Sequence, residues 1–499
     1  MNPRVKYRWR DNCEGEFIRK LYDQNSLEYQ NAMFRCINEG DLNTAVQCVN
    51  QMYSYAAESM TVKVNKSERK CKYFDRECVN LKKEKLRVLN RFRKTRDEID
   101  YRLYFELKSQ YNILLRRKEN EYILKQQEEL RTNMKDTNTC WKAMKRFKSK
   151  SNESSINSVE WTSYFNTLLN VNVKISETHM QRVQTFMQHH DNNCNVCIDN
   201  TIDNLYELNN DFSLEEIRRA ILDLPNCKSP GHDGLVAELF KHSIDVCAPI
   251  MKLICNAIVN STIFPDQWAN ALLLPIHKKG AFNDPNNYRG IALLPVMSKI
   301  LTRCINQRLT TWAEINGKLY EEQCGFRKNR STIDQIFTLQ SVVQKYISKR
   351  RGRFYGIFVD FSKAFDSVSH ICLWYKLLTE GLHGKMVNTL RAMYAKLQAA
   401  VVTPEGVAEF FSTVTGVRQG CQMSPFLFSF YLNEFVDVCN KQNGQGIYIS
   451  EIFPNVMLLM YADDMVEGAD SIGRLQKSIN LLSTYCDDWG LQVNLEKLK

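Results

Sequence analysis

Residues 458–466 read LLMYADDMV, in which two adjacent carboxylates, Asp463 and Asp464, follow an apolar run. Asp tolerates the unusual backbone angles of tight turns, so the stretch is typical of a hairpin between two strands. Two neighbouring anions also repel each other and lose hydration when they are partly buried, which is costly unless a cation or a proton compensates. Mg²⁺, which binds carboxylate oxygens, is one such cation. The stretch by itself leaves both interpretations open, a structural turn and a metal site.

A second carboxylate motif lies in RFYGIFVDFSKAFDSV, residues 353–368. Residues 355–359 are apolar and rich in strand-forming types, and Asp360 follows at the carboxyl end of this predicted strand. Carboxylates at two strand ends can hold two Mg²⁺ ions for phosphoryl transfer. Asp366 is a rival ligand, but it precedes a predicted helix, so we interpret it as a cap or turn residue.

Between the two carboxylate motifs, residues 412–425 read STVTGVRQGCQMSP. Gly416 and Gly420 permit close backbone approach, and Arg418 and Gln419 supply hydrogen-bond donors. A donor-rich loop that leads into a helix suits an anion or a base. Turns also use glycine, so a purely structural loop is the alternative.

Further cations lie upstream, in the Gly- and Asn-rich stretches 272–295 and 323–335. Each of them alone is more often an exposed charge, but together, ahead of two carboxylate motifs, they could hold a triphosphate and favour nucleotide polymerisation. These cations are Lys278, Lys279, Arg289, Arg327, Lys328 and Arg330.

The bulk properties indicate a globular protein with a polyanionic partner. The 499 residues, 44% of them hydrophobic, provide for about two to four domains with substantial cores, and the net charge is +11. The seventeen cysteines are scattered, which favours a reducing compartment. The N-terminus does not resemble a secretory signal, and no run of about 18 apolar residues occurs. We therefore expect an intracellular protein, nuclear or cytoplasmic, without a membrane partner.

The stretch HHDNNCNVC, residues 189–197, contains two histidines and a C-x2-C pair. Zinc sites usually separate their two ligand pairs by a longer segment, so we favour a polar linker over a zinc site.

The N-terminal part of the chain is predicted to be helical and basic. Residues 63–96 contain fourteen Lys or Arg against four Asp or Glu, and no proline occurs between residues 62 and 160. This pattern predicts long helices, in a hairpin or a bundle arm, with a basic face. That face is either a solvated surface or a surface that follows a nucleic-acid backbone.

We divide the chain into a basic helical arm region (residues 1–147), a linker with short helices (148–210) and a compact domain (211–499). The compact domain is expected to open with the helix DFSLEEIRRAILDL, in which Ser213 is the N-cap and Glu216 its capping-box partner.

The order of these motifs resembles that of the reverse transcriptases of non-long-terminal-repeat (LINE-like) retrotransposons, over residues 211 to 499. The resemblance rests on seven segments in the family's order: KSPGHDGLVAELFK, PIHKKG with NYRGIALLP, GFRKNRSTIDQ, FVDFSKAFDSV, GVRQGCQMSP, YADD and WGLQVNLEKLK. Seven segments are far more specific than YADD alone.

The resemblance implies an α+β fold, a right-hand polymerase with fingers and a ferredoxin-like antiparallel palm sheet. It implies that Asp360 and Asp463 are the principal Mg²⁺ ligands, with Mn²⁺ as an alternative ion, and that Asp464 is the third active-site carboxylate. Phe365 falls where the family keeps an aromatic gate against the ribose 2′-hydroxyl, with a core aromatic as the alternative. Gln419, next to Gly420, matches a residue near the incoming nucleotide.

The resemblance further implies an RNA template, a DNA primer and dNTPs as partners. Gly290 departs from the family, which commonly has proline there. The chain stops within the last matching motif, so we expect a truncated polymerase without thumb or endonuclease. The alternative function is a catalytically incompetent remnant that binds nucleic acid. An RNA-directed RNA polymerase is disfavoured by Ala462, where that class commonly carries glycine.

Overall fold

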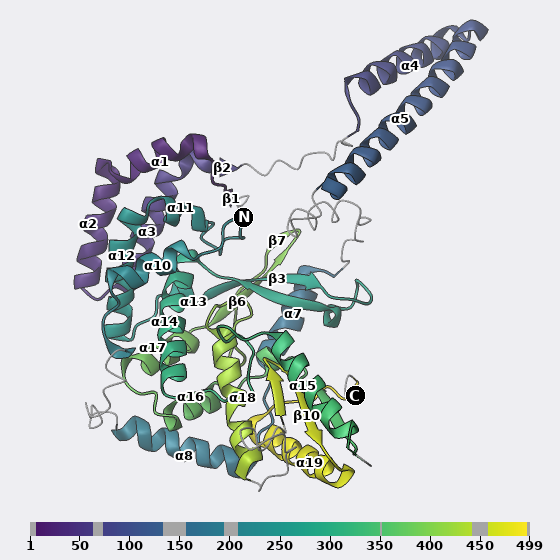
Figure 1. The fold of residues 1–499 in the computed structure, drawn as a ribbon. Helices are drawn as coiled ribbons and strands as arrows, with labels where there is room; N and C mark the ends of the chain where they lie inside the picture. The colour runs from purple at the N-terminus through teal and green to yellow at the C-terminus, as the bar shows by residue number, and fades with distance from the viewer. Residues whose placement is uncertain are drawn as a thin grey trace. The chain divides into compact units, whose positions relative to one another are not determined.

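The computed structural model describes residues 6–62, 73–132, 156–193, 208–349, 352–441 and 458–496 (Figure 1). The chain divides into two compact units: Val64–Ser154 form one, and Met1–Lys63 together with Ser155–Lys499 form the other. The division differs from the predicted one, because the N-terminal helices belong to the larger unit and not to the arm.

The smaller unit is the predicted helical hairpin, and its two helices are α4 (Arg76–Thr95) and α5 (Glu98–Thr132). Cys78 and Val88 of α4 are buried between the helices. Ion pairs join the helices at both ends of α4, from Lys118 to Asp75 at 2.7 Å and from Arg91 to Asp100 at 2.6 Å. Residues 63–72 and 133–155 of the predicted arm and linker lie outside the described residues.

The larger unit contains most of the helices and all the strands of the described chain. Its helices are α1 (Glu14–Leu21), α2 (Gln24–Asn38), α3 (Leu42–Ala56), α7 (Ser158–Leu169), α8 (Glu177–Asn193), α10 (Leu214–Leu222), α11 (Ala237–His242), α12 (Ile244–Ser261), α13 (Asp266–Ala269), α14 (Val296–Ile315), α15 (Thr332–Ile347), α16 (His370–Thr379), α17 (Lys385–Ala395), α18 (Ser424–Lys441) and α19 (Ile472–Trp489). A two-stranded sheet of β1 (Lys6–Tyr7) and β2 (Thr61–Val62) flanks α1 to α3.

Helix α3 explains why the N-terminal residues belong to the larger unit. Its apolar face is buried, and the ring of Tyr53 packs on Phe240 of α11 with the centroids 4.6 Å apart. The Tyr53 hydroxyl lies 2.9 Å from the Ser243 hydroxyl. Burial of this face holds α3 against α11 and α12 (Figure 1).

Residues 158–193 were predicted to be a linker with short helices, but they form α7 and α8 and are part of the core. Trp161 and Phe165 of α7 are buried, and α7 packs against β6. Helix α8 buries Val183 and Met187 and packs against α16. The buried apolar residues are separated in the sequence by many polar ones, so the sequence analysis did not recognise an apolar face on these helices.

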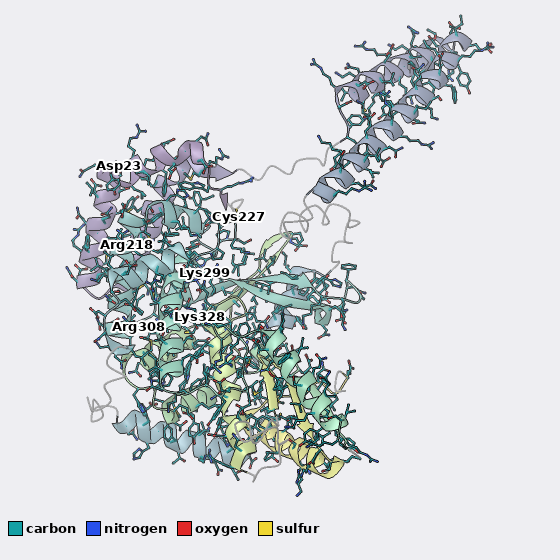
Figure 2. All side chains as sticks on the ribbon, in the orientation of Figure 1. Asp23, Arg218, Cys227, Lys299, Arg308 and Lys328 are labelled. Atoms are coloured by element: carbon teal, nitrogen blue, oxygen red, sulfur yellow. The ribbon has the colours of Figure 1, made fainter. Side chains whose placement is uncertain are left out.

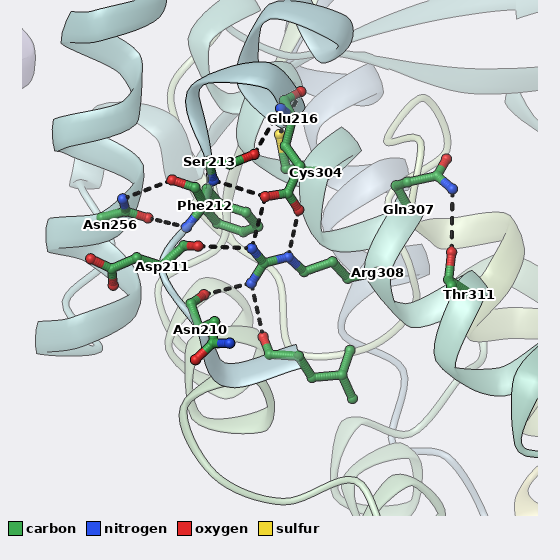
Figure 3. Close-up of polar contacts among 11 residues, drawn as sticks. Asn210, Asp211, Phe212, Ser213, Glu216, Asn256, Cys304, Gln307, Arg308 and Thr311 are labelled. Carbon is green, nitrogen blue, oxygen red and sulfur yellow. Dashed lines mark hydrogen bonds and ion pairs between the residues drawn. The ribbon is translucent and has the colours of Figure 1, made fainter. Parts of the chain in front are cut away.

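The compact domain opens at α10 as predicted. The Ser213 side chain accepts from the Glu216 backbone N–H at 3.2 Å, and Glu216 accepts from the Ser213 N–H at 2.8 Å, which is the expected capping box. Arg308 of α14, labelled in Figure 2, then donates to both oxygens of Glu216 and to the carbonyls of Leu208, Asn210 and Asp211 (Figure 3). One guanidinium group therefore ties the start of α10 to α14.

One sheet is built around β3 (Asn270–His277). Its order is β4-β3-β6-β7, with β8 also paired to β6. The hairpin of β3 and β4 (Tyr288–Leu293) is antiparallel, whereas β6 (Gln398–Thr403) joins β3 in parallel. The short strands β7 (Gly406–Val407) and β8 (Phe411–Ser412) complete it.

The second sheet is antiparallel and has the order β5-β10-β9. It consists of β5 (Tyr355–Asp360), β9 (Leu458–Tyr461) and β10 (Asp464–Ala469). Val359, Met465 and Met460 point into the core, where α19 packs against β5 and β10 (Figure 1). Mixed helices and an antiparallel sheet confirm the predicted α+β class, and we call this second sheet the palm sheet.

Helix α12 is long and apolar enough to meet the length and composition criteria for a membrane span, and half of it is buried inside the unit. It packs against α3, α10 and α17, as a core helix does. The thirteen cysteines within the described residues are free thiols, most of them buried.

Candidate active site

Asp360 and Asp464 face each other across the palm sheet. They are directly paired in the register of β5 and β10, and Asp464 also pairs with Tyr461 of β9. Alternation along the strands places Val359 and Met465 in the core, so the two carboxylates lie on the opposite, open face. Like charges in directly opposed positions destabilise a sheet.

Asp463 lies in the two-residue turn between β9 and β10, next to Ala462. Ala462 has a φ of 59°, in the left-handed region, and is 5% exposed. A left-handed conformation at a residue other than glycine costs about 1–3 kcal/mol and persists only where its surroundings enforce it. The turn that carries Asp463 is therefore held in a strained conformation.

A third segment reaches the carboxylates from the C-terminal side. The Asn494 backbone N–H donates to the Asp360 carbonyl at 2.8 Å, and its side-chain amide donates to Asp360 Oδ2 at 3.2 Å. A bridge between Phe361 and Val493 continues this contact. The position of Asp360 is thus fixed by β10 on one side and by residues 493–494 on the other.

The donor chemistry of this face fits divalent cations. Asp360, Asp463 and Asp464 supply only oxygen ligands, which Mg²⁺ prefers, and a cation would offset the repulsion between the two opposed carboxylates. In the part of the chain that the structure describes, however, no three His, Cys, Asp or Glu side chains are gathered closely enough to form a complete metal site. Any ion would therefore draw further ligands from substrate or water.

A groove of about 760 Å³ runs beside the carboxylates, between α15 and the open face of the palm sheet. Its wall includes Asp360, Asp464, Phe358, Val466, Leu459 and Ile336. The carboxylates and apolar side chains of this wall suit a ligand with both polar and apolar parts.

Asp366 joins the two loops that flank the site. It ends a 3-10 turn and caps no helix, because Ser369 precedes α16. Both of its carboxylate oxygens accept from Gln419 Nε2, at 2.8 and 3.0 Å. Burial raises the pKa of Asp366 to about 6. The predicted turn position is correct, but the side chain binds the glycine loop instead of capping a helix.

The glycines of this loop are required by close approach, as predicted. A Cβ on Gly416 would lie 2.8 Å from Asp366 Cα, and a Cβ on Gly420 would lie 2.4 Å from the Ala292 carbonyl oxygen. Gly290 of β4 has a similar explanation, since a Cβ there would meet the Phe165 ring at 2.6 Å. The departure at Gly290 makes room for α7.

Arg418 donates to the backbone of the protein itself, and its predicted contact with substrate stays a prediction. Its guanidinium donates to the Trp268 carbonyl at 3.3 Å and to the Ala269 carbonyl at 2.7 Å. Desolvation lowers its pKa. The side chain fixes the loop to the start of β3 through these two bonds.

The upstream cations separate into distinct groups. Lys278, after β3, and Arg289, on β4, act electrostatically on Asp366, and so does Lys363, which the sequence analysis missed. Lys279 is exposed at the β3–β4 connection. Arg330 forms an ion pair with Glu321. Only Lys278 and Arg289 of the predicted set are therefore brought to the loops around Asp366.

Arg327 and Lys328, two more of the predicted cations, lie in different environments. Arg327 is bound to Glu314 of α14 and to the carbonyls of Tyr320 and Gln323, so it anchors the 318–331 loop. Lys328 lies on the surface of that loop (Figure 2).

Phe365 is half-buried and stacks on Phe428 of α18, with ring centroids 4.8 Å apart. Its carbonyl accepts from the Val417 N–H at 2.7 Å. The ring is therefore supported from below and lies beside the glycine loop, as a gate residue would, and the gate stays a prediction.

Helix α4 of the arm carries a cationic stripe. Arg76, Lys83, Arg87 and Lys94 recur at intervals of seven, four and seven residues, which places them within a narrow sector of the helix over about 27 Å. None of the four forms an ion pair within residues 73–132. The ion pairs of the hairpin instead use Arg91 of α4 and three cations of α5, which are Arg102, Arg117 and Lys118.

The zinc alternative at residues 189–197 gains no support from the described part. Asp191 forms an ion pair with Arg391 at 2.8 Å, and the His190 ring stacks on His383. Cys194 and Cys197 lie outside the described residues.

Two antiparallel strands that present opposed carboxylates beside an open groove fit the polymerase palm that the sequence motifs resemble. A family model described as reverse transcriptase (RNA-dependent DNA polymerase) matches residues 276–499. Residues 276–499, just under half of the chain, are therefore similar to the reverse transcriptase family.

The chain is 27% identical over 298 residues to the RNA-directed DNA polymerase from mobile element jockey of Drosophila melanogaster. It is 30% identical over 294 residues to a probable RNA-directed DNA polymerase from transposon BS of the same organism. Each match covers 57% of this chain and 31% of the relative, so the chain spans about a third of these proteins. Among solved structures, a telomerase of Candida tropicalis aligns with 16% identity over 52% of this chain and 55% of its own, at a TM-score of 0.36.

Proposed function

We propose that the chain is the polymerase region of a non-LTR retrotransposon protein that copies an RNA template into DNA by extending a DNA primer with dNTPs. The observation that carries the proposal is the register of Asp360 and Asp464 on the open face of the palm sheet, within the residues that the reverse transcriptase family matches.

Asp360, Asp463 and Asp464 would hold two divalent ions, Mg²⁺ or alternatively Mn²⁺. Such ions activate an attacking oxygen and stabilise the charge on the leaving oxygen in phosphoryl transfer. The residues of the chain supply the geometry: β5 and β10 hold two carboxylates in direct opposition, and the β9–β10 turn holds the third. Ligands on rigid strands suit a reaction that depends on positioning.

The flanking loops would bind the nucleotide. Lys278 and Arg289 provide positive charge near the Asp366 loop, suitable for a triphosphate. Gln419 is oriented by Asp366 through its Nε2, while its Oε1 has no hydrogen-bond partner among the described residues. That oxygen is a buried acceptor to which an incoming nucleotide would supply a donor. Phe365 would limit the space for a 2′-hydroxyl.

The test is primer extension by the 499-residue chain on an RNA template with a DNA primer, dNTPs and Mg²⁺. We expect template-directed DNA products that disappear in Asp463→Asn. The matched control is Asp470→Asn, because Asp470 follows the far end of β10 and pairs with Arg474. Binding of template and primer without any extension would favour the incompetent remnant, and products made only from rNTPs would favour an RNA polymerase.

A further inference from the structure

The side chain of Gln323 is buried directly against the turn between β9 and β10. It is fully buried, and its Oε1 accepts from the Ala462 N–H at 3.0 Å and from the Gly325 N–H at 2.8 Å. Its Nε2 donates to the Ala462 carbonyl at 3.4 Å. One amide side chain therefore binds both backbone polar groups of Ala462.

These two groups of Ala462 take no part in the pairing of Tyr461 with Asp464 across the hairpin. Because the N–H and the carbonyl of Ala462 are buried, each would lower the stability of the folded state if it had no hydrogen-bond partner. The Ala462 carbonyl also belongs to the peptide group that leads into Asp463. The hydrogen bonds from Gln323 therefore fix the orientation of the peptide plane between Ala462 and Asp463, which sets the direction of the Asp463 side chain. They also hold Ala462 in its left-handed conformation.

Gln323 is itself held from several sides. The Cys324 N–H donates to the Met460 carbonyl at 2.9 Å, and the Met460 N–H donates to the Glu322 carbonyl at 2.8 Å, so residues 322–324 extend the edge of β9. Asn433 of α18 accepts from the Tyr320 N–H at 3.0 Å. The 318–331 loop is thus a rigid support for Gln323.

Gly325 permits this close contact. A Cβ on Gly325 would lie 2.2 Å from the Ala462 backbone nitrogen and 2.9 Å from the Gln323 amide oxygen. The backbone at residue 325 therefore lies against the turn, and any side chain there would push the loop away from it. Neither Gln323 nor Gly325 was identified as functional from the sequence. Only the cations of this loop were predicted to have a role.

We propose that Gln323 is a positioning residue of the active site, which sets the orientation of Asp463 by clamping the strained Ala462 turn from the 318–331 loop. The inference rests on the proposed function and extends it from the carboxylates to the loop that supports them. Gln323 touches no reacting atom, so its loss should alter metal binding and turnover and leave nucleotide binding largely unchanged.

The first experiment compares Gln323→Met with Gln344→Met in the full chain. Met has a similar length but cannot pair with Ala462, and Gln344 is an exposed residue of α15. We expect Gln323→Met to lower kcat by about 10- to 100-fold, the scale expected when a catalytic group is misplaced by about 1 Å. The KM for dNTP should change by less than about twofold, as for a loss of transition-state stabilisation alone. The Mg²⁺ concentration for half-maximal activity should rise.

A second experiment tests the clamp by relieving the strain. Glycine adopts positive φ without penalty, so Ala462→Gly should make the turn less dependent on Gln323. We expect Gln323→Met to cost less activity in the Ala462→Gly background than in the wild type. Equal losses in the two backgrounds would mean that Gln323 only fills space, and the proposal would be wrong.

A third measurement does not depend on catalysis. Mn²⁺ binding to the chain without substrate, followed by electron paramagnetic resonance, should weaken severalfold in Gln323→Met and in Gly325→Ala, and stay unchanged in Gln344→Met. If the wild type extends primers and the Gln323 variant matches it in both activity and Mn²⁺ binding, only the present inference fails. If the wild type extends no primer, the proposed function fails, and the Mn²⁺ titration decides the role of Gln323 separately.

Discussion

Asp464 of the central palm strand β10 lies directly opposite Asp360 of the edge strand β5, although 103 residues of chain separate them. The same register buries Val359 opposite Met465, one position along. The arrangement brings two like charges together on an open face.

Removal of one opposed carboxylate should stabilise the protein when no divalent ion is present. In EDTA, Asp464→Asn should raise the free energy of unfolding by roughly 0.2–1 kcal/mol, because opposed like charges destabilise a sheet by about that amount. It should also reduce the rise in Tm on addition of Mg²⁺. Denaturant unfolding with and without Mg²⁺ measures both effects, with Asp470→Asn as the control. A loss of stability in EDTA would show that Asp360 and Asp464 do not repel each other.

Arg418 should be important for stability and not for nucleotide affinity. Arg418→Leu leaves the carbonyls of Trp268 and Ala269 without their donor, and each unsatisfied group costs roughly 1–3 kcal/mol. Denaturant unfolding should reveal this loss, and a smaller one in Arg418→Lys, which keeps a donor. Arg289→Gln, at an exposed cation, should instead raise the KM for dNTP without a change in stability. An increased KM in Arg418→Lys at unchanged stability would identify Arg418 as a substrate contact.

Phe365 should discriminate against ribonucleotides. Phe365→Val removes part of a ring that Phe428 supports, which opens space for a 2′-hydroxyl. The ratio of rNTP to dNTP incorporation, measured by single-nucleotide extension, should therefore rise. Phe337→Val, at an exposed position of α15, is the control and should keep the wild-type ratio. An unchanged ratio in Phe365→Val would identify the ring as a core aromatic.

The cationic stripe of α4 should bind nucleic-acid phosphates without sequence preference. Replacement of Arg76, Lys83, Arg87 and Lys94 by Gln should lower affinity and make the log–log salt slope shallower by up to about 3, at about 0.7 per phosphate contact on a single strand. Fluorescence anisotropy with two unrelated RNA sequences measures the slope. The control replaces four cations of the electrically balanced helix α5, which are Arg102, Lys108, Arg116 and Arg131. Equal effects of the two sets would mean that nucleic acid responds to the net positive charge of the arm and not to the alignment of cations on α4.

Asp233 should make the protein less stable as the pH rises. Burial raises its pKa to about 7, and the folded state therefore binds a proton that the unfolded state releases near pH 4. Its contribution to the free energy of unfolding is therefore complete below pH 4. Between pH 4 and pH 7 this contribution decreases, by at most about 1.4 kcal/mol per pH unit.

Asp233→Asn keeps an acceptor for the Leu235 N–H and should lack this pH dependence. Unfolding curves between pH 4 and 8 compare it with the wild type and with Asp245→Asn, an exposed residue of α12. Parallel curves for the wild type and Asp233→Asn would contradict the assignment.

The sequence predicted the elements that depend on neighbours along the chain. The α4–α5 hairpin, the Ser213–Glu216 capping box, the strand that ends at Asp360 and the hairpin around Asp463 all rest on short-range periodicity, caps and turn residues. The domain boundaries were less accurate, because whether α3 or α7 joins a core depends on the surface that it meets.

What the sequence determined by itself is the chemistry: the three carboxylates, the glycine loop and the basic arm follow from residue types and their order. The tertiary structure decided which polar groups are free to act. Arg418 binds backbone carbonyls, Asp366 binds Gln419, and Gln323 supports the turn before Asp463. The physical reason is that a buried polar group must find a partner, and that partner is set by packing between distant segments, which no local pattern records.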